Sequence, residues 1–516
     1  MMRITNAMMT SNTKNNININ KLNEDRLNTQ ISTGQVISRP SEDPVVAIRA
    51  LRLNTNLSQL TQYYKKNIPD AQAWLNVTET ALKQTDQIFT NIKENLTTGA
   101  SDTNTATDRQ KILESLKGLR SELYSSGNAD YAERTVFTGY RTGESLTFLE
   151  TDKDLDWNYE IHETFDTKEL DKINYVTTYK DASKSETEVV SKEIKRIRLS
   201  YDSLNETDDA SKTLTWYDGT AIKNQLVTVQ SIEGLTQEQI DTIYTDVANA
   251  SGDKAVLIPE TGEILLSKSL ADKMEAGANK PGAEPASLDY NKNSWQSGDL
   301  RPEHYFSCQQ TTPTSTVIYN CKVDPDSGKP EWGPDYYDFK NQNLEVEISF
   351  NQKITINTHA NEVYTHDIGR DIDELIRITQ DTVDADEKVK SLEKKLAAAS
   401  DTEKATIQAE LDAANKEYSL KKNKMQKMFS AALDKFEGYA DRNNVAIANI
   451  GSMQQRLTIT KERVADQLQS FKELADANIN AELTESSIDF SSAKLALEAA
   501  QLAAGKIAQQ TLLNYL

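Results

Sequence analysis

The sequence predicts a mainly α-helical protein whose two ends fold together as a discontinuous antiparallel helical bundle or coiled coil, with a mainly β central module inserted between them. Both flanks repeat apolar residues at alternating spacings of four and three, which keeps one stripe facing a partner helix. The flanks are nearly free of proline, whereas eight of the 11 prolines and four of the five tryptophans lie between about 150 and 360. That middle contains short β-type runs such as TLTWYDG and NLEVEISF, separated by turn residues.

The composition excludes several classes of function. The chain has 516 residues and a formal net charge of −21. Nucleic acids and anionic membrane surfaces attract clustered cations, so this balance argues against both as partners. No stretch approaches 18 uninterrupted apolar residues, and we therefore expect no membrane insertion. The N-terminus also lacks the apolar core of a secretory signal peptide.

The first flank begins with a clear helix start. Asp43 can cap free backbone N–H groups, and Pro44 suits the first helical position, where its missing donor is not needed. Pro69 interrupts the helical pattern. The stripe that follows it consists of Ala71, Leu75, Thr78, Leu82, Thr85, Phe89, Ile92 and Leu96. We expect this stripe to form the core of a bundle.

The second flank carries an unbroken series from Met425 to Leu474 at the same alternating spacing. A helix of about 50 residues rises roughly 75 Å, more than a globular helix needs. Upstream, residues 381–424 are predicted to be a helical insertion, in which helices over 372–399 and 402–424 flank a break at Ser400-Asp401.

The extreme ends are predicted to be assembly regions. Residues 5–30 are rich in asparagine, a mediocre helix former, so we expect this segment to be frayed or unfolded in the isolated chain. The C-terminal helix carries an apolar face up to the chain end, which needs a partner. We expect its face at Leu497, Ala504 and Ile507 to be exposed or disordered in the monomer. The predicted assembly contacts are Ile4, Met8, Leu27, Ile31, Leu497, Ala500, Ala504, Ile507, Leu512, Leu513 and Leu516.

Three domains follow from these boundaries. Residues 1–42 with 480–516 form the terminal assembly region, and residues 151–364 form the outer β module. Between them, residues 43–150 with 365–479 form the helical bundle, including a β-hairpin at about 134–150. Because the β module is inserted between bundle flanks, we expect it to be dispensable.

Candidate chemistry is sparse. The four histidines show no HExxH spacing, and no phosphate-binding glycine motif occurs. His304, Cys308 and Cys321 could supply three soft ligands, but no fourth appears at metal-like spacing. We therefore predict no catalytic, cofactor-binding or metal-binding residues, and no enzyme activity. A disulfide between Cys308 and Cys321 is favoured if the protein is extracellular.

One segment resembles a known family. LNTQISTGQVISRPSEDPVVAIRALRL, from Leu27 to Leu53, is similar to the N-terminal signature of the hook-associated protein 3 family. Val136–Gly143 resembles its β-hairpin, and the Ala/Leu-rich end from Leu495 to Leu516 resembles its terminal helix. The residues that carry the family motif are Arg39, Pro40, Ser41, Asp43 and Pro44.

This resemblance implies a flagellin-like fold and a structural role in the bacterial flagellum, at the junction that joins the hook to the flagellin filament. It implies type III export without a cleaved signal peptide, and an extracellular location. The implied partners are like subunits in a ring, hook-associated protein 1, flagellin and a flagellar export chaperone. The alternatives are a flagellin-type filament subunit, a surface adhesin displaying the β module, and an enzyme carried on that module.

Overall fold

The computed structural model describes residues 6–101, 104–152, 156–177, 189–206, 211–325, 327–332, 342–400 and 402–513. These residues form two compact units. The first consists of residues 1–72, 346–354 and 455–516, and the second consists of residues 73–345 and 355–454. The N- and C-terminal helices with a central β-sheet module agree with the predicted fold class. The three-domain division stays a prediction about parts that fold independently.

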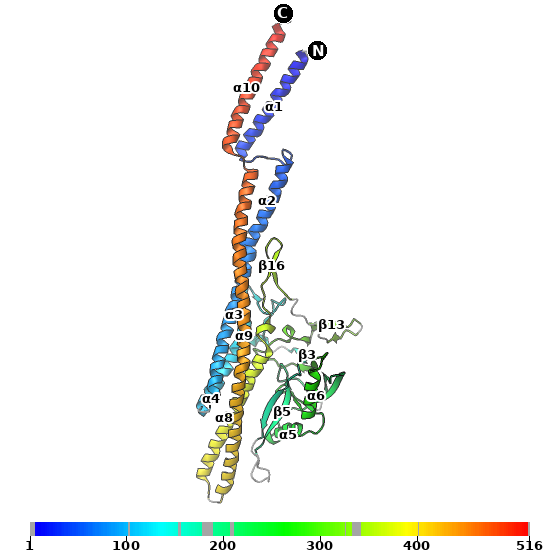
Figure 1. Cartoon of the computed structure of the whole chain (residues 1–516), viewed down its shortest axis with the longest axis vertical. Helices are drawn as coiled ribbons and strands as arrows, with labels where there is room; N and C mark the ends of the chain where they lie inside the picture. The colour runs from blue at the N-terminus through cyan, green and yellow to red at the C-terminus, as the bar shows by residue number, and fades with distance from the viewer. Residues whose placement is uncertain are drawn as a thin grey trace. The chain divides into compact units, whose positions relative to one another are not determined.

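The first unit contains both ends of the described chain. Helices α1 (Asn6–Thr33) and α10 (Leu483–Leu513) run antiparallel, side by side, as Figure 1 shows in blue and red. The expectation of a frayed or unfolded N-terminal segment, which was based on the asparagine content, is therefore wrong for residues 6–30, because these residues are helical. Packing against a neighbouring helix stabilises a helix more than the propensity of its residues does, and α10 supplies that packing.

The rest of the first unit comprises α2 (Pro44–Gln62), a π turn η1 (Tyr63–Asn67), the start of α3 (Ile68–Gly99) and the end of α9 (Lys404–Ile479). The π turn lies directly before Pro69. Proline lacks the N–H that would bond to the carbonyl four residues earlier. The helical run continues through this position by way of the π turn, in which the Ile68 N–H donates to the Tyr63 carbonyl. The interruption predicted at Pro69 is thus a π turn within a helical run rather than a break.

A small hairpin also belongs to this unit. Strands β15 (Glu345–Ser349) and β16 (Gln352–Thr355) form a two-stranded sheet. The Phe350 ring packs edge-on against Tyr63, with 5.7 Å between the ring centroids. The Asn67 side-chain amide donates to the Glu347 carbonyl at 2.8 Å. Sequence reasoning placed these residues in the outer β module, whereas they contact the helices of the first unit.

The second unit contains the remainder of α3 and α9 with α4 (Ala106–Gly127) and α8 (His366–Ala398). The stripe predicted after Pro69 is confirmed: all eight residues from Ala71 to Leu96 are fully buried. In α9 the predicted series is buried from Met425 to Leu457 except for the half-buried Met453. The Phe89 and Phe436 rings meet edge-on at 6.4 Å. The apolar stripes therefore form intramolecular core, as the sequence predicts.

Helix α8 ends at Ala398 and α9 begins at Lys404, on either side of the predicted break at Ser400-Asp401, of which Asp401 lies outside the described residues. The two helices have an apolar cluster of their own, formed by Val389, Leu392, Leu411 and Ala414. Lys388 Nζ lies 2.9 Å from Glu417 Oε2 across the two helices. Residues 381–398 and 404–424 are thus helical, and the second helix continues without interruption into the rest of α9. Their assignment as an insertion stays a prediction.

The β module is built on a ten-stranded sheet in the order β12-β11-β3-β10-β6-β7-β8-β9-β5-β4. Its neighbouring strands pair antiparallel except for β7 and β8, which pair parallel. The strands are β3 (Asn158–Phe165), β4 (Asp171–Val176), β5 (Ser191–Arg198), β6 (Ser211–Tyr217), β7 (Ile222–Val229), β8 (Ala255–Ile258), β9 (Glu263–Leu266), β10 (Ala286–Lys292), β11 (Ser307–Thr311) and β12 (Thr316–Tyr319).

Short elements complete the module. They are α5 (Gln237–Ala248), α6 (Lys268–Ala278), the 3₁₀ turns η2 (Glu150–Asp152) and η3 (Pro302–His304), the paired strands β13 (Lys322–Val323) and β14 (Pro330–Glu331), and α7 (Ala360–Val363). Phe148 and Trp295 stack at 4.4 Å in its main core.

The β-hairpin expected at about 134–150 lies earlier in the chain. Strands β1 (Asp130–Tyr131) and β2 (Arg134–Thr135) pair around Ala132 and Glu133, which both have positive φ. Two such residues form the tight turn that suits a hairpin. Residues 136–149 contain no strand: the backbone turns at Gly139, where φ is 63°, and Thr147 forms an isolated bridge with Leu300.

Candidate functional site

The segment that carries the family motif connects α1 to α2 within the first unit. Gly34 ends α1 with φ of 70°, a conformation that favours glycine. The segment then pairs with the end of α9: Val36 N–H donates to the Ile479 carbonyl at 2.8 Å, and Ala481 N–H donates to the Gly34 carbonyl at 2.9 Å. The short link between α1 and α2 is thus tied to the short link between α9 and α10.

The predicted helix start is confirmed at Asp43. Its Oδ1 accepts from the Val45 and Val46 N–H groups at 2.9 and 3.1 Å, with Pro44 in the first turn. One turn earlier, the Ser38 N–H and hydroxyl donate to the Glu42 carboxylate, and these bonds lower the pKa of Glu42.

The remaining motif residues, Arg39, Pro40 and Ser41, are exposed. The motif therefore combines a helix cap with an exposed surface turn.

The predicted assembly contacts fall into three groups. Ile4 and Leu516 lie outside the described residues, and for Ile507, Leu512 and Leu513 the structure describes the backbone of α10 alone. Met8 is exposed. Ile31, Ala500 and Ala504 are half-buried, and Leu27 and Leu497 are buried.

The burial of Leu497 corrects an expectation. Its side chain is 8% exposed in the single chain, whereas the sequence analysis expects this face to be exposed or disordered in the monomer. The reason is that α1 lies along this face of α10. The side-chain amide of Asn20 in α1 reaches the Ala496 carbonyl in α10, at 3.4 Å. A charge at Leu497 would therefore disrupt the α1–α10 pair itself.

A different face of α10 is exposed, and sequence reasoning missed it. Ile488, Leu495 and Leu502 lie at intervals of seven residues and are all largely exposed, Leu502 to 70%. Seven-residue spacing places residues nearly in line on a helix. Ile19 and Leu22 of α1 and Val45, Ile48 and Leu51 of α2 are exposed as well. The spacing of the three α10 residues was the signal that could have identified this stripe.

A buried ion network joins the β module to α8 within the second unit. Arg196 of β5 contacts Glu263 of β9 at 2.8 Å and Glu374 of α8 at 2.6 Å. Arg198 contacts Asp371 at 2.6 Å and Glu374 at 3.0 Å. These arginines lower the pKa of Glu374 to about 2, against the effect of burial, which raises it. The network keeps the Glu374 charge paired away from water.

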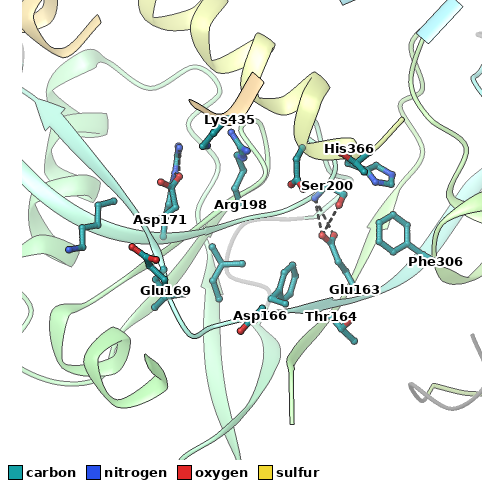
Figure 2. A pocket seen from close by; sticks show the side chains of 17 residues that line it. Glu163, Thr164, Asp166, Glu169, Asp171, Arg198, Ser200, Phe306, His366 and Lys435 are labelled. Atoms are coloured by element: carbon teal, nitrogen blue, oxygen red, sulfur yellow. Dashed lines mark hydrogen bonds and ion pairs between the residues drawn. The ribbon is translucent and has the colours of Figure 1, made fainter. Parts of the chain in front are cut away.

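A polar pocket of about 800 Å³ adjoins this network. Figure 2 shows Arg198 and Lys435 on one side and Glu163 with Ser200, Phe306 and His366 on the other. Glu163 accepts from the Ser200 hydroxyl at 2.7 Å and from the Tyr290 hydroxyl at 2.6 Å. Burial raises the pKa of Glu163 to about 7 despite these bonds. The bonds fix the carboxyl in place and give it a structural role in the module.

The two cysteines are free, so the favoured disulfide is not formed. Cys308 lies opposite Tyr319 in the β11–β12 pair, which places Cys321 two residues beyond the direct partner. Cys321 itself lies beyond the end of β12, after Asn320 with φ of 57°, so the strand register does not extend to it. Cys308 is instead buried in the core of the module.

None of the helices in the described part of the chain is both long and apolar enough to cross a bilayer.

Comparison with known proteins shows what the N-terminal region is similar to. Residues 4–142 match the family model of the bacterial flagellin N-terminal helical region. This region is flagellin-like. The curated relatives include flagellar hook-associated protein 3 of Salmonella typhimurium strain LT2, 28% identical over 142 residues, and that of Escherichia coli K12, 28% identical over 150 residues. A flagellin of Clostridium tyrobutyricum is 24% identical over 143 residues. The resemblance noted in the sequence is therefore confirmed for the flagellin-like region.

These matches cover part of each protein. They span 27% and 29% of this chain, and 44% and 47% of the two hook-associated relatives. The flagellin match spans 28% of this chain and 38% of that relative.

Among solved structures, a flagellar hook-associated protein from Vibrio parahaemolyticus covers 85% of this chain and all of its own, at 12% identity and a TM-score of 0.34. A hook-associated protein 3 from Legionella pneumophila covers 82% of this chain and 97% of its own, at 9% identity and a TM-score of 0.31. Scores this low carry no weight in the assignment.

Proposed function

We propose that this protein is a structural subunit of the bacterial flagellum, located at the junction between hook and filament. The observation that carries the proposal is the match of residues 4–142 to the flagellin N-terminal region, with hook-associated protein 3 among the relatives. The motif from Arg39 to Pro44 supports the junction role over a filament role, because flagellins typically have alanines where this chain has Arg39-Pro40 and Pro44.

In this role the paired ends α1 and α10 form the axial core of the assembly, the helices of the bundle pack as an antiparallel coiled coil, and the β module points outward. The partners are neighbouring copies of this chain in a ring, hook-associated protein 1 on one face and flagellin on the other. A flagellar export chaperone holds the chain before type III export, which proceeds without cleavage of a signal peptide. The role is mechanical and requires no catalysis.

The exposed stripe Ile488, Leu495 and Leu502 supports such an assembly. Exposed apolar side chains in line on one helix favour contact with another apolar surface. In the proposed ring, the α1–α10 pair forms within each subunit, and this outer stripe of α10 contacts neighbours.

Immunogold labelling of isolated flagella tests the proposal. A junction protein gives a few gold particles at one point, between hook and filament. Labelling along the whole filament would indicate a flagellin-type subunit instead, and labelling of the cell surface away from flagella would indicate an adhesin. Intact-mass measurement of the labelled protein checks that no signal peptide has been removed.

A further inference from the structure

Three polar side chains from two parts of the second unit converge at η3. The ligand atoms of Glu144, Glu303 and His304 all lie within 4.8 Å of one another. Glu303 and His304 are buried, and Glu144 is half-buried. They come from the loop after β2 and from η3, about 160 residues later in the chain.

The convergence is held by a fixed arrangement of the loop. The Arg141 guanidinium donates to the Glu303 backbone carbonyl and, at 3.0 Å, to the Asn320 side-chain oxygen. The Asn320 amide donates to the same Glu303 carbonyl at 2.8 Å. His304 Nε2 lies 3.0 Å from the Ser145 carbonyl, to which it donates. A histidine ligand of a metal commonly donates its second ring N–H to a carbonyl in this way.

The same place contains polar atoms that lack partners. Within the described part of the chain, Glu144 Oε2, Glu303 Oε2 and His359 Nε2 are buried without a hydrogen bond. Glu303 is 1% exposed, and its other oxygen has the Arg301 guanidinium at 3.6 Å. Buried polar groups are almost always paired, so the unpaired oxygens of Glu144 and Glu303 in the cluster indicate a missing partner. His359, whose Nε2 is also unpaired, lines the same cavity as Glu303.

A small cavity adjoins two members of the cluster, Glu303 and His304, whereas Glu144 does not line it. Its volume is about 10 Å³, and Glu303, His304 and His359 all line it. A volume of roughly this size holds about one water molecule. Two carboxylates and one or two imidazoles are a typical ligand set for a divalent transition cation, bound at about 2.0–2.2 Å. Ligand atoms up to 4.8 Å apart need only a small contraction to reach that geometry.

We propose that Glu144, Glu303 and His304, with His359 on the other side of the cavity, bind a structural divalent transition cation of the zinc type. The ion links the loop after β2, η3 and the residue that precedes α7. Its positive charge pairs with the carboxylates of the half-buried Glu144 and the buried Glu303, and its position inside the protein suits a structural rather than a catalytic site. Arg141 and Arg301 remain in place, because they bond to other atoms of the site.

The experiment uses full-length protein treated with EDTA, dialysed and then titrated with zinc chloride by calorimetry, with bound zinc counted by mass spectrometry of the metal. The expected result is one zinc per chain and a higher melting temperature with zinc. Glu303→Gln and, separately, Glu144→Gln should each weaken binding by at least about 100-fold. Glu160→Gln, on β3 and outside the cluster, is the matched control and should bind as the wild type does.

The proposal would be overturned if calorimetry detects no zinc binding at zinc concentrations up to about 1 mM. A Kd of that size corresponds to a binding free energy of only about −4 kcal/mol. Binding that Glu303→Gln and Glu144→Gln leave unchanged would indicate an adventitious ion only, held by exposed carboxylates. Because Glu144 is half-buried in a loop, Glu144→Gln remains informative if Glu303→Gln fails to fold. The buried Tyr159 hydroxyl interacts with the Glu303 carboxylate. Tyr159→Phe should leave zinc binding unchanged, and loss of binding in that variant would assign the site to a different set of groups.

Discussion

At the scale of single residues, Glu374 holds the β module to α8. It pairs with Arg196 and Arg198, and all three side chains are largely buried. Without the Glu374 charge, Arg196 keeps Glu263 and Arg198 keeps Asp371 as partners, so the change removes charge-assisted hydrogen bonds without orphaning a cation, at a cost of about 1.5–3 kcal/mol. Glu374→Gln should therefore lower the free energy of unfolding by about that amount. Urea unfolding measures it, with Asp384→Asn on the exposed side of α8 as the control, expected to change it by less than about 0.5 kcal/mol.

The pH dependence of that difference gives a second readout. The pKa of Glu374 is about 2 in the folded protein, below the value of about 4.3 in an unfolded chain. Its contribution is therefore complete above about pH 4.5 and is lost as the pH falls towards 2. The gap in stability between wild type and Glu374→Gln should shrink over that range. A gap that stays constant from pH 5 to about pH 2.5 would show that the charge of Glu374 has no role.

For Glu163, the dependence of stability on pH has the opposite sign. Burial raises its pKa to about 7, so the folded state holds a proton there that the unfolded state has lost. The protein is then most stable with respect to this group at low pH, and stability falls as the pH rises through 7. Glu163→Gln cannot ionise, and it should exceed the wild type at pH 8 by up to about 3 kcal/mol and match it at pH 4. Equal stability at pH 8 in urea unfolding would contradict the raised pKa.

At the scale of elements, the α1–α10 pair separates two faces of one helix. Leu497 is buried and Leu502 is 70% exposed. Leu497→Glu should unfold the pair, since burying a charge without a partner costs several kcal/mol. Leu502→Glu should change monomer stability by less than about 0.5 kcal/mol and yet prevent assembly. Hydrogen exchange in α1 and α10 measures the first effect, and release of unattached flagellin into the medium measures the second.

Each of the two variants has an outcome that would contradict the interpretation of α10 given above. If Leu497→Glu leaves exchange in α1 unchanged, the pair is not formed in the free chain, and the sequence-based expectation of an uncovered face would be correct after all. If Leu502→Glu assembles normally, the exposed stripe of α10 is not a contact between subunits.

Periodicity explains why the buried residues of the core helices could be predicted, whereas the covered face of the terminal helix could not. From Ala71 to Leu96 the apolar spacing alone identifies buried residues, because one stripe faces one core. The rule fails towards the end of α9, where Leu474 continues the series but is 56% exposed. In α10, alanines and leucines surround the helix, so composition does not distinguish Leu497 from Leu495. Only the position of α1 decides which of them is covered.

Contacts between distant segments were beyond the reach of sequence reasoning. No local sequence pattern connects Glu144 and His359 with Glu303 and His304. By spacing along the chain, His304 is instead grouped with Cys308 and Cys321. The β11–β12 register then places Cys308 in the core. The ion network has the same character, since Arg196 and Glu374 are far apart in the chain. In each case the topology of the sheet brings the groups together.

At the scale of the whole molecule, the β module is the part for which the structure differs most from the sequence-based expectation. The sequence predicts an inserted, dispensable module, whereas in the structure it shares a compact unit with the bundle. The Tyr305 hydroxyl donates to the Tyr364 carbonyl at 2.6 Å, and the Tyr305 ring lies 4.3 Å from that of His366 at the start of α8. The module therefore covers aromatic surface that the bundle helices leave open.

Two deletions separate the contributions of the module and of the β15–β16 hairpin. Replacing residues 156–342 with a Gly/Ser linker keeps the hairpin, and replacing 155–355 removes it as well. Both deletions uncover Tyr364 and His366, so the second unit should melt more than about 5 °C below the wild type. Only the larger deletion removes the contact of Phe350 with Tyr63, so only it should increase hydrogen exchange around η1. If the smaller deletion melts as the wild type does and still supports motility, the module is dispensable, and its contacts with α8 add nothing that the bundle needs.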